Sequence, residues 1–570
     1  MLDLVVRNGE VVDGTGSAPK RADVGVREGR VVAIGDIDED ANETIDADGH
    51  IVAPGFVDIH THYDAQVLWD PAATPSPLHG VTTVVGGNCG FTIAPVEESE
   101  IDYLTRMLAR VEGMPLESLL EGVKYDWRTF GEYLDKIEGN VAVNAGFLVG
   151  HCAIRRVVMG DDAVGNEASR EQIDKMREVL SDSIAGGGLG FSSSQATTHN
   201  DADGEPVPSR FATPEELVAL CEVAGQHEGT TLEFIPHVGA FEDQHRQLMA
   251  DMSRAANRPL NWNVLVPNAA NGPYVEAQLG ASDFATKQGG KVLALTVPDV
   301  MTTFLTFKAG FVLDALPGWR KTMALPLNEK MKALADPVER KRLADGASSP
   351  EAGMFRGLAN WKNMTIVETF SKENEGLAGR TIGDVAAERG QDPFDAICDI
   401  SLLDGLRTII QPPLAGNDDE SWRLRRDVWR DPRAVVGASD AGAHLDMLST
   451  FSFSTAMLRS VREHGLMPIE EAVHLLTDRQ ARLYGLRERG RIAEGWHADL
   501  VIFDPATVKP GAVSWRNDLP AGAGRLYAGA EGIAHVITNG TEIVRGTELT
   551  GNNPGTVLRS GRDTETVTAR

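Results

Sequence analysis

The chain has 570 residues, of which 42% are hydrophobic and 24% are charged, and its formal net charge at pH 7 is −29. These proportions are typical of a folded globular protein and exclude long disorder. The acidic excess, with no local cluster of lysine and arginine, argues against nucleic acid as a partner, because a phosphate backbone would be repelled.

The first residues and the cysteines predict a cytoplasmic protein. Residues 1–9 contain an early acid and lack the apolar core of a signal peptide. No apolar stretch approaches the ~20 residues that a bilayer span requires, so we expect no membrane partner. The four cysteines lie far apart, and nothing in their spacing suggests an oxidising compartment.

Both ends of the chain show short alternating strands. Asn8-Gly9 separates two apolar runs, and Asn-Gly in that setting predicts a hairpin. The pattern returns in residues 499–504 and 535–544. Neither end could bury a core alone, so we expect residues 1–53 and 488–550 to pair as one discontinuous small β-sandwich domain.

Eight buried apolar runs, separated by amphipathic helical stretches, occupy the middle of the chain. Continuous apolar runs are typical of parallel strands buried on both faces. Eight such units within residues 54–487 predict an α/β fold, a TIM-like (β/α)8 barrel, with a doubly wound open sheet as the alternative. The runs are 51–59, 82–85, 142–149, 188–192, 231–235, 260–266, 292–297 and 434–438.

Two segments do not fit a simple barrel. Residues 299–433 are too long for a crossover and carry helical patterns, so we expect them to contain a lid insertion over the barrel mouth before strand 8. A surface subdomain is the alternative interpretation. Residues 551–570 are polar and predict an extended or poorly ordered tail.

The sharpest chemical signal is His60-Thr61-His62 at the end of the first run. Residues i and i+2 of a strand point to the same face, so both imidazoles can reach one metal ion. A barrel builds its site at the C-terminal ends of its strands, and other candidate groups follow such ends. These groups, after the second, third, fifth and eighth runs, are Cys89, His151, His237 and Asp440.

Residues 52–62, the triplet Ala438-Ser439-Asp440 and residues 489–501 resemble the metal-dependent amidohydrolase superfamily, over nearly the whole chain. Within it, residues 86–90, 149–151 and 188–193 resemble the N-acyl-D-amino-acid deacylase (D-aminoacylase) branch. In that branch a strand-2 cysteine replaces the carbamylated lysine used elsewhere. Consistently, residues 188–194 contain no lysine.

The resemblance implies a metal-dependent hydrolase of a linear amide, most of all an N-acyl-D-amino acid, with one or two Zn²⁺ ions that activate water. It assigns His60 and His62 to one metal position, with Asp440 as a ligand and general base. It assigns Cys89 and His237 to a second position. Superfamily members usually associate, so the resemblance also implies a homo-oligomer.

Further polar residues are candidates for catalysis or substrate binding. A neutral His151 would donate a hydrogen bond to the developing oxyanion. Arg155 and Arg210 would pair with a substrate carboxylate, and Ser193 and Asn263 are further substrate-binding candidates. The family places a metal-binding histidine on strand 6, which this chain lacks. The second metal position is therefore weakened, rebuilt with Asn263 or His151, or lost.

Two other functions compete with this one. A cyclic amide or ureide hydrolase, of the hydantoinase or dihydroorotase kind, would need a carbamylated lysine on strand 4. A catalytically silent barrel acting as a binding protein would explain the missing strand-6 histidine. Against it stand two imidazoles, a thiol and a carboxylate that are all predicted at one mouth.

Overall fold

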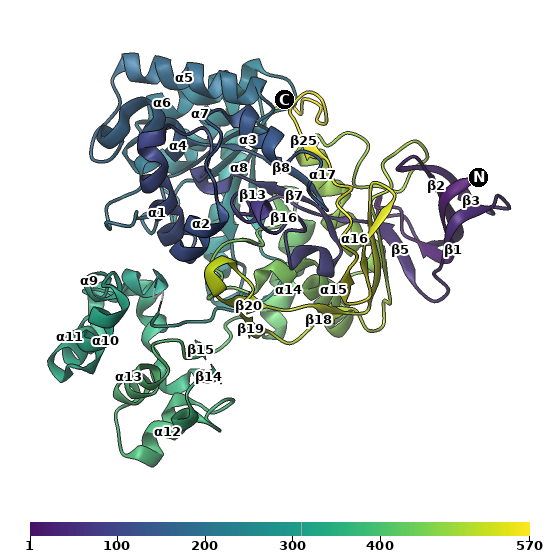
Figure 1. The fold of residues 1–570 in the computed structure, drawn as a ribbon. Helices are drawn as coiled ribbons and strands as arrows, with labels where there is room; N and C mark the ends of the chain where they lie inside the picture. Colours follow the sequence, from purple (N-terminus) through teal and green to yellow (C-terminus); the bar gives the residue numbers. More distant parts are fainter. Residues whose placement is uncertain (309–310) are drawn as a thin grey trace.

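The computed structural model describes residues 1–308 and 311–570 (Figure 1). Strands from both chain ends form one nine-stranded sheet, in the order β24-β23-β22-β17-β5-β1-β2-β3, with β4 paired to β1. β5 joins the two ends, because it pairs with β1 on one side and with β17 on the other. The strands are β1 (Leu2–Val11), β2 (Lys20–Arg27), β3 (Arg30–Gly35), β4 (Ala41–Asp46), β5 (Ile51–Pro54), β17 (Leu500–Phe503), β22 (Ile533–Thr538), β23 (Thr541–Arg545) and β24 (Glu548–Leu549).

Asn8-Gly9 does not form the predicted hairpin. β1 runs through this dipeptide, and a β-bulge between Val6 and Gly9 takes up the extra residue. Asn8 has a φ of 62° in this bulge. A hairpin turn would use the same left-handed backbone conformation, so the Asn-Gly dipeptide alone does not distinguish a bulge from a turn. Hairpins form instead at Glu28-Gly29 and at Asn539-Gly540, where both residues have positive φ.

Parallel strands form two further sheets. One has the order β25-β8-β7-β6 and the other the order β16-β13-β12-β11-β10-β9. Only Leu148 separates β8 from β9, and a parallel bridge joins Thr61 to Ala441, so the sheets meet at both edges. The strands are β6 (Phe56–Asp58), β7 (Val81–Gly86), β8 (Asn144–Phe147), β9 (Val149–Gly150), β10 (Gly190–Ser194), β11 (Thr231–Ile235), β12 (Leu260–Leu265), β13 (Val292–Thr296), β16 (Ala434–Val436) and β25 (Val557–Leu558).

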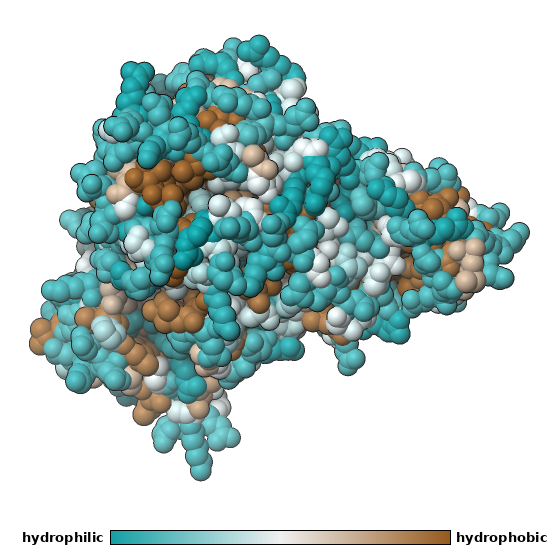
Figure 2. Space-filling view, turned by 45° about the horizontal axis from the view of Figure 1, so that its top comes forward, coloured by the Kyte–Doolittle hydropathy of each residue, from teal (hydrophilic) through white to brown (hydrophobic). Residues whose placement is uncertain are grey.

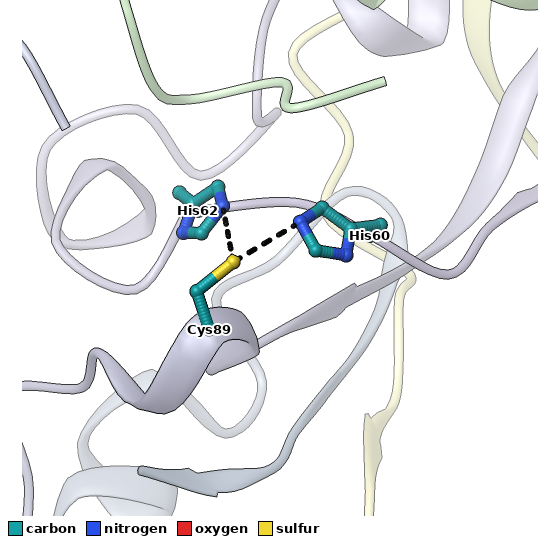
Figure 3. Close-up of side chains that lie close together, drawn as sticks. All are labelled: His60, His62 and Cys89. Atoms are coloured by element: carbon teal, nitrogen blue, oxygen red, sulfur yellow. Dashed lines mark hydrogen bonds between the residues drawn. The ribbon is translucent and has the colours of Figure 1, made fainter. Parts of the chain in front are cut away.

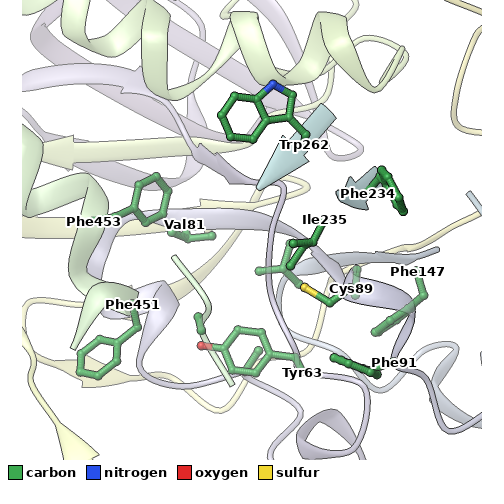
Figure 4. Packing of buried hydrophobic residues seen from close by; sticks show 14 of the residues in the cluster. Tyr63, Val81, Cys89, Phe91, Phe147, Phe234, Ile235, Trp262, Phe451 and Phe453 are labelled. Atoms are coloured by element: carbon green, nitrogen blue, oxygen red, sulfur yellow. The ribbon is translucent and has the colours of Figure 1, made fainter. Parts of the chain in front are cut away.

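Helices follow the parallel strands and cover them (Figure 1). Their apolar faces and the strands share one large buried cluster, and Figure 4 shows Phe147, Phe234 and Trp262 in it, near Cys89. Capping fixes several helix starts; Ser169, for example, accepts the N–H of Gln172 at the start of α5. The helices are α1 (Ile101–Val111), α2 (Leu116–Gly122), α3 (Phe130–Ile137), α4 (His151–Met159), α5 (Arg170–Ala185), α6 (Pro214–Gln226), α7 (Asp243–Ala256), α8 (Gly272–Lys287), α14 (Asp419–Arg430), α15 (Phe453–His464), α16 (Ile469–Leu476) and α17 (Asp478–Leu483).

Most of residues 299–433 forms a unit with its own core. Trp319, Trp361 and Phe394 pack together in a cluster separate from that of the parallel strands. In Figure 1 this unit stands below α1 and α2, whereas α14 lies with the parallel strands. Its elements are α9 (Arg320–Met323), α10 (Leu327–Ala335), α11 (Pro337–Ser348), β14 (Thr365–Glu368), α12 (Ile382–Arg389), α13 (Pro393–Leu403) and β15 (Ile409–Gln411).

The tail after residue 550, predicted to be extended or poorly ordered, is an extended segment that packs against β8. β25 pairs in parallel with β8, and Val557 and Leu558 are fully buried. Arg559 donates a hydrogen bond to the carbonyl oxygen of Gly186 over 2.8 Å. Two apolar residues in a polar segment predict a strand only weakly. They form one here because the edge of β8 is available for pairing.

The surface is largely hydrophilic on the face that Figure 2 shows, and its hydrophobic residues lie in separate patches. In the described part of the chain, no helix combines the length and the apolar character that a membrane crossing demands. Two short strand pairs complete the C-terminal region: β18 (Lys509–Pro510) with β21 (Ala530–Glu531), and β19 (Ser514–Arg516) with β20 (Arg525–Tyr527).

Candidate metal centre

Four donor side chains meet beyond the C-terminal ends of β6, β7 and β16. His60 Nε2 lies 3.5 Å from Cys89 Sγ and 3.1 Å from Asp440 Oδ1. His62 Nε2 lies 4.0 Å from the same sulfur and 3.7 Å from the same oxygen. Figure 3 shows the two imidazoles turned toward the thiol. The structure therefore brings together four of the residues predicted from the sequence.

Local backbone geometry aims these groups at one another. The pairing of β6 with β7 continues where the backbone N–H of Thr61 donates to Val85 O, and the Asn88 side chain donates to both Thr61 O and Val85 O. Cys89 and Asp440 have positive φ values of 57° and 49°. Sharp left-handed turns at strand ends are costly and occur at functional sites, where the surrounding contacts hold them in place.

The donor set fits a zinc ion. With bonds of roughly 2.0–2.3 Å, tetrahedral zinc keeps its donor atoms about 3.3–3.7 Å apart. The distances from the two imidazoles to the thiol and to the carboxylate are 3.1–4.0 Å. The ligand atoms of His60, His62 and Cys89 all lie within 4.8 Å of one another, a group that does not include Asp440. Imidazole, thiolate and carboxylate are the ligands that zinc takes in proteins. His60, His62 and Cys89 are also fully or nearly fully buried, so their polar atoms need a partner.

The charges around the cluster favour an ionised carboxylate. Burial alone would raise the pKa of Asp440, but hydrogen bonds and charge from His60 and His62 outweigh it and hold that pKa well below its usual range. Burial lowers the pKa of His60. Burial also opposes protonation of His62, yet the charges of Glu112 and Asp440 raise its pKa to about 9. Asp440 is thus a proton acceptor at neutral pH.

Two buried glutamates support the donors, and sequence reasoning missed both. Glu112 Oε1 lies 3.3 Å from His62 Nδ1. Glu233 Oε2 accepts the backbone N–H of Cys89 over 2.7 Å, and its Oε1 accepts an amide N–H of Asn263. A charged residue within the apolar run of β11 was the available signal for Glu233. Glu112 follows α1 with no local signal, because only the tertiary fold places it beside His62.

A cavity of about 330 Å³ opens over the cluster. Its walls include all four donors, Glu112 and two histidines that the motifs did not identify, His199 and His444. Burial lowers the pKa of His199 to about 3 and that of His444 to about 4, so both are neutral at pH 7. Among the described residues, no lysine, no arginine and no part of 299–433 lines this cavity.

His237 and Asn263 line the same cavity. The His237 ring stacks on His245, with centroids 4.8 Å apart, and lies outside the His60, His62 and Cys89 group. Its role as a ligand of a second ion stays a prediction. Asn263 turns its amide nitrogen toward Glu233 and is nearly fully buried.

His151, Ser193 and Arg155 do not line this cavity, and their roles in catalysis and substrate binding stay predictions. All three are fully buried and absent from the cavity wall. His151 uses one ring nitrogen for Ser193 Oγ, 2.8 Å away, and the other for Glu216 Oε1, 2.9 Å away. Arg155 donates to both oxygens of Glu216 over 2.6 Å. A buried guanidinium needs such a partner, so Arg155 is a structural ion pair.

Arg210 does not face the cavity either. The guanidinium of Arg210 donates to His199 O over 3.2 Å and to Asn200 Oδ1 over 2.9 Å. It therefore supports the loop that carries His199. The predicted contact between Arg210 and a substrate carboxylate stays a prediction.

Comparisons with known proteins agree with this geometry. Residues 43–543 match the amidohydrolase family. The chain is 29% identical over 562 residues to a D-aminoacylase of Alcaligenes xylosoxydans xylosoxydans, covering 98% of this chain and 97% of the relative. It is 28% identical to an N-acyl-D-aspartate deacylase of the same organism, with 98% and 95% covered.

The solved structures that resemble it include a D-aminoacylase variant in complex with copper chloride. The TM-score is 0.66 at 26% identity, and the match covers 98% of this chain and 100% of that one. The shared fold is the α/β TIM-barrel fold of amidohydrolases. The chain therefore belongs to the amidohydrolase family, as a hydrolase of its D-aminoacylase branch.

Proposed function

We propose that the protein hydrolyses the linear amide bond of N-acyl-D-amino acids or related N-acyl compounds, with zinc held by His60, His62, Cys89 and Asp440. The observation that carries the proposal is the group of His60, His62 and Cys89, whose ligand atoms all lie within 4.8 Å of one another. Asp440 Oδ1 lies 3.1 Å and 3.7 Å from the two imidazoles, and all four residues line a cavity of about 330 Å³. The names of the relatives, a D-aminoacylase and an N-acyl-D-aspartate deacylase, support this substrate class.

The residues around the metal position would have separate roles in this reaction. When bound, zinc polarises the amide carbonyl and lowers the pKa of water. Asp440 is ionised and its side chain is 25% exposed, so it can accept a proton from water and return it to the leaving amine. Glu112, beside His62 Nδ1, holds that imidazole in the orientation that presents Nε2 to the cluster.

The same proposal assigns one ion to the four-donor group. Two ions, the second held by Cys89 and His237 or rebuilt with Asn263 or His151, are the alternative that the sequence left open. Elemental analysis of protein purified without chelator separates the two: a zinc-to-chain ratio near one supports the four-donor centre, and a ratio near two supports the binuclear one.

We further propose that the strands of the two parallel sheets within 54–487, with β8 and β9 as one interrupted strand and without β25, close into one eight-stranded barrel. We also propose that 1–53 with 488–550 form the small β-sandwich. The edge-to-edge approach of the sheets and the shared β5 support this division. The insertion within 299–433 borders a second cavity beside the candidate site, a position compatible with a lid. The homo-oligomer and the cytoplasmic location stay predictions.

Asp440→Asn tests the proposed chemistry. The amide has the same shape but accepts no proton, so we expect kcat to fall by roughly 10²–10⁴-fold. Asp504→Asn, in a turn of the C-terminal region, is the matched control and should keep full activity. The measurement is hydrolysis of a panel of N-acyl-D-amino acids, N-acyl-L-amino acids and neutral amides, with zinc content determined for each variant.

Three results would count against the proposal. Full activity of Asp440→Asn, or equal activity of zinc-free and zinc-loaded protein, would overturn the mechanism. Activity confined to amides without a carboxylate would overturn the N-acyl-amino-acid part and leave the hydrolase part standing. Protein that binds no metal and hydrolyses nothing would support the silent-barrel alternative.

A further inference from the structure

A second cavity, of about 320 Å³, lies where the insertion meets the α1–α2 region. Its walls come from the α1–α2 region and the insertion, and from four further places in the chain. The insertion contributes Lys308, Met323, Ala324 and Lys330, and the other residues are Ala202, Leu445, Asp446, Trp515 and Gly524. It shares a wall with the candidate metal site, because Glu112 and His444 line that site while the next residues, Gly113 and Leu445, line this cavity. The backbone N–H of His444 donates a hydrogen bond to the backbone carbonyl oxygen of Glu112, which links the two segments that form this shared wall.

Lys330, on α10, is the unusual group in this cavity. It is only 4% exposed, and its ammonium makes one hydrogen bond, to Lys308 O at 2.7 Å. No carboxylate of the described residues lies within ion-pair distance of it. An ammonium has three N–H donors, and a buried one is normally paired with an opposite charge. Lys330 therefore has unused donors at the edge of a cavity.

Charged side chains of both signs face the cavity. Arg106, Arg110 and Lys308 stand with Lys330, against the carboxylates of Glu117 and Asp446. Arg106 is paired with Asp102 and Asp203, and Arg110 with Asp314. Asp446 accepts a hydrogen bond from the Thr306 hydroxyl over 2.7 Å. The arginines are thus paired with carboxylates, whereas the ammonium of Lys330 has only the carbonyl oxygen of Lys308 as a partner among the described residues.

The rest of the wall is largely apolar. Met114, Met323, Leu445 and Trp515 line it. The first three are nearly fully buried. A cavity with one underused buried cation and an apolar lining suits a ligand with an anionic head and an apolar body.

We propose that this cavity binds a small organic carboxylate, whose head group pairs with Lys330 and whose apolar chain packs on Met114, Met323 and Leu445. Two sources supply this chemistry: a free carboxylic acid, or the carboxylate of a larger N-acyl molecule. Binding at this cavity does not depend on the proposed hydrolysis, because it needs neither the metal nor Asp440.

The test is calorimetric titration of the full chain, stripped of metal, with octanoate, acetate and octanamide. Octanoate is expected to bind one per chain, and acetate and octanamide at least tenfold more weakly. Lys330→Met, which keeps the length of the side chain and removes its charge, should weaken octanoate at least tenfold. Lys341→Met removes a lysine of α11 that is exposed and paired with Asp345, so it should bind as the wild type does.

A second variant guards against a folding defect. Ala324 lines the cavity from an exposed position, so Ala324→Trp fills the space without disturbing the core and should abolish octanoate binding. Without ligand, Lys330→Met should raise the thermal midpoint, because an underpaired buried ammonium is replaced by an apolar chain. A Lys330 that merely braces Lys308 O would lower it instead.

Several results would overturn the proposal: no binding of octanoate by the wild type, unchanged affinity in both Lys330→Met and Ala324→Trp, or octanamide or phosphate binding as tightly as octanoate. Kinetics of the metal-loaded enzyme then separate the sources. A tenfold rise of KM for an N-acyl-amino acid in Lys330→Met assigns the site to the substrate's own carboxylate. An unchanged KM, with octanoate binding still lost, assigns it to a free acid.

Discussion

Cys89 is held in the donor cluster by Glu233. The carboxylate accepts the backbone N–H of Cys89 with one oxygen and the Asn263 amide with the other, so it links β11 and β12 to the turn after β7. Glu233 is fully buried and has no arginine or lysine partner among its hydrogen bonds. Burying a carboxyl group without a cationic partner costs solvation free energy. Such a cost is expected where the group orients a metal ligand.

Replacing Glu233 should therefore weaken metal binding without removing a donor. Glu233→Leu leaves the Cys89 N–H unsatisfied, and we expect zinc affinity to fall about 10–100-fold. Glu233→Gln keeps an acceptor for that N–H and should recover most of the loss. Competition with a chromophoric chelator measures the affinity, and the thiolate-to-cobalt absorption of Co²⁺-loaded protein reports whether Cys89 still binds.

Asn261→Leu is the matched control, since Asn261 is equally buried on β12 but donates to Leu232 O and Tyr484 Oη. It should keep wild-type zinc affinity. Wild-type affinity and an unchanged cobalt spectrum in Glu233→Leu would show that Glu233 does not position Cys89.

His79 makes the stability of the protein depend on pH. Its ring is fully buried, 2.7 Å from Thr455 Oγ1 and 3.1 Å from Ala528 O, and burial lowers its pKa from 6.5 to about 4. Between these values the unfolded chain binds the proton more readily than the folded one. Stability is therefore complete above pH 6.5 and is lost as the pH falls toward 4, by on the order of 3 kcal/mol.

Thermal midpoints of the wild type and His79→Gln, measured from pH 7 to pH 4, check this prediction. The wild type should lose more stability than the variant across that window. His464→Gln, at an exposed position, should follow the wild type. Parallel pH profiles for the wild type and His79→Gln would refute the assignment.

At the scale of elements, the hydrophobic pattern of the sequence located the central strands of the parallel sheets more accurately than the strands at the sheet edges. The runs 231–235 and 260–266 agree with β11 and β12 to within a residue, because parallel strands buried on both faces are mostly apolar along their length. The run 51–59 is in fact two strands in different sheets, β5 and β6, divided at Gly55. An apolar run does not specify its partner, so this division is invisible in the sequence.

β25 should contribute more stability than its two residues suggest. Leu558→Ala leaves a cavity between β25 and β8, and we expect a loss of about 2–5 kcal/mol, measured by denaturant unfolding. Leu549→Ala, whose side chain is 40% exposed on β24, should cost far less. Equal losses for the two variants would mean that the tail adds nothing beyond an exposed strand.

The whole molecule carries a charge of −29, which opposes the approach of an anionic substrate. Salt screens such repulsion with a Debye length of about 10 Å at 0.1 M. Raising the ionic strength from low to physiological values should therefore increase kcat/KM for an N-acyl-amino acid by about twofold or more, and leave a neutral amide unchanged. A decrease with salt would show that local attraction dominates.

The sequence by itself determined the chemistry and its general location. His60-Thr61-His62, Cys89 and Asp440 each follow an apolar strand, and parallel strands bring their C-terminal ends to one face, so their convergence could be predicted. Only the tertiary structure decided which neighbours they have. Glu112 is distant in sequence from His62. Glu216 pairs with Arg155 and with a ring nitrogen of His151, two of the groups predicted to meet substrate. Burial explains both arrangements, because a charged side chain removed from water is stabilised by an opposite charge that the packed fold places beside it.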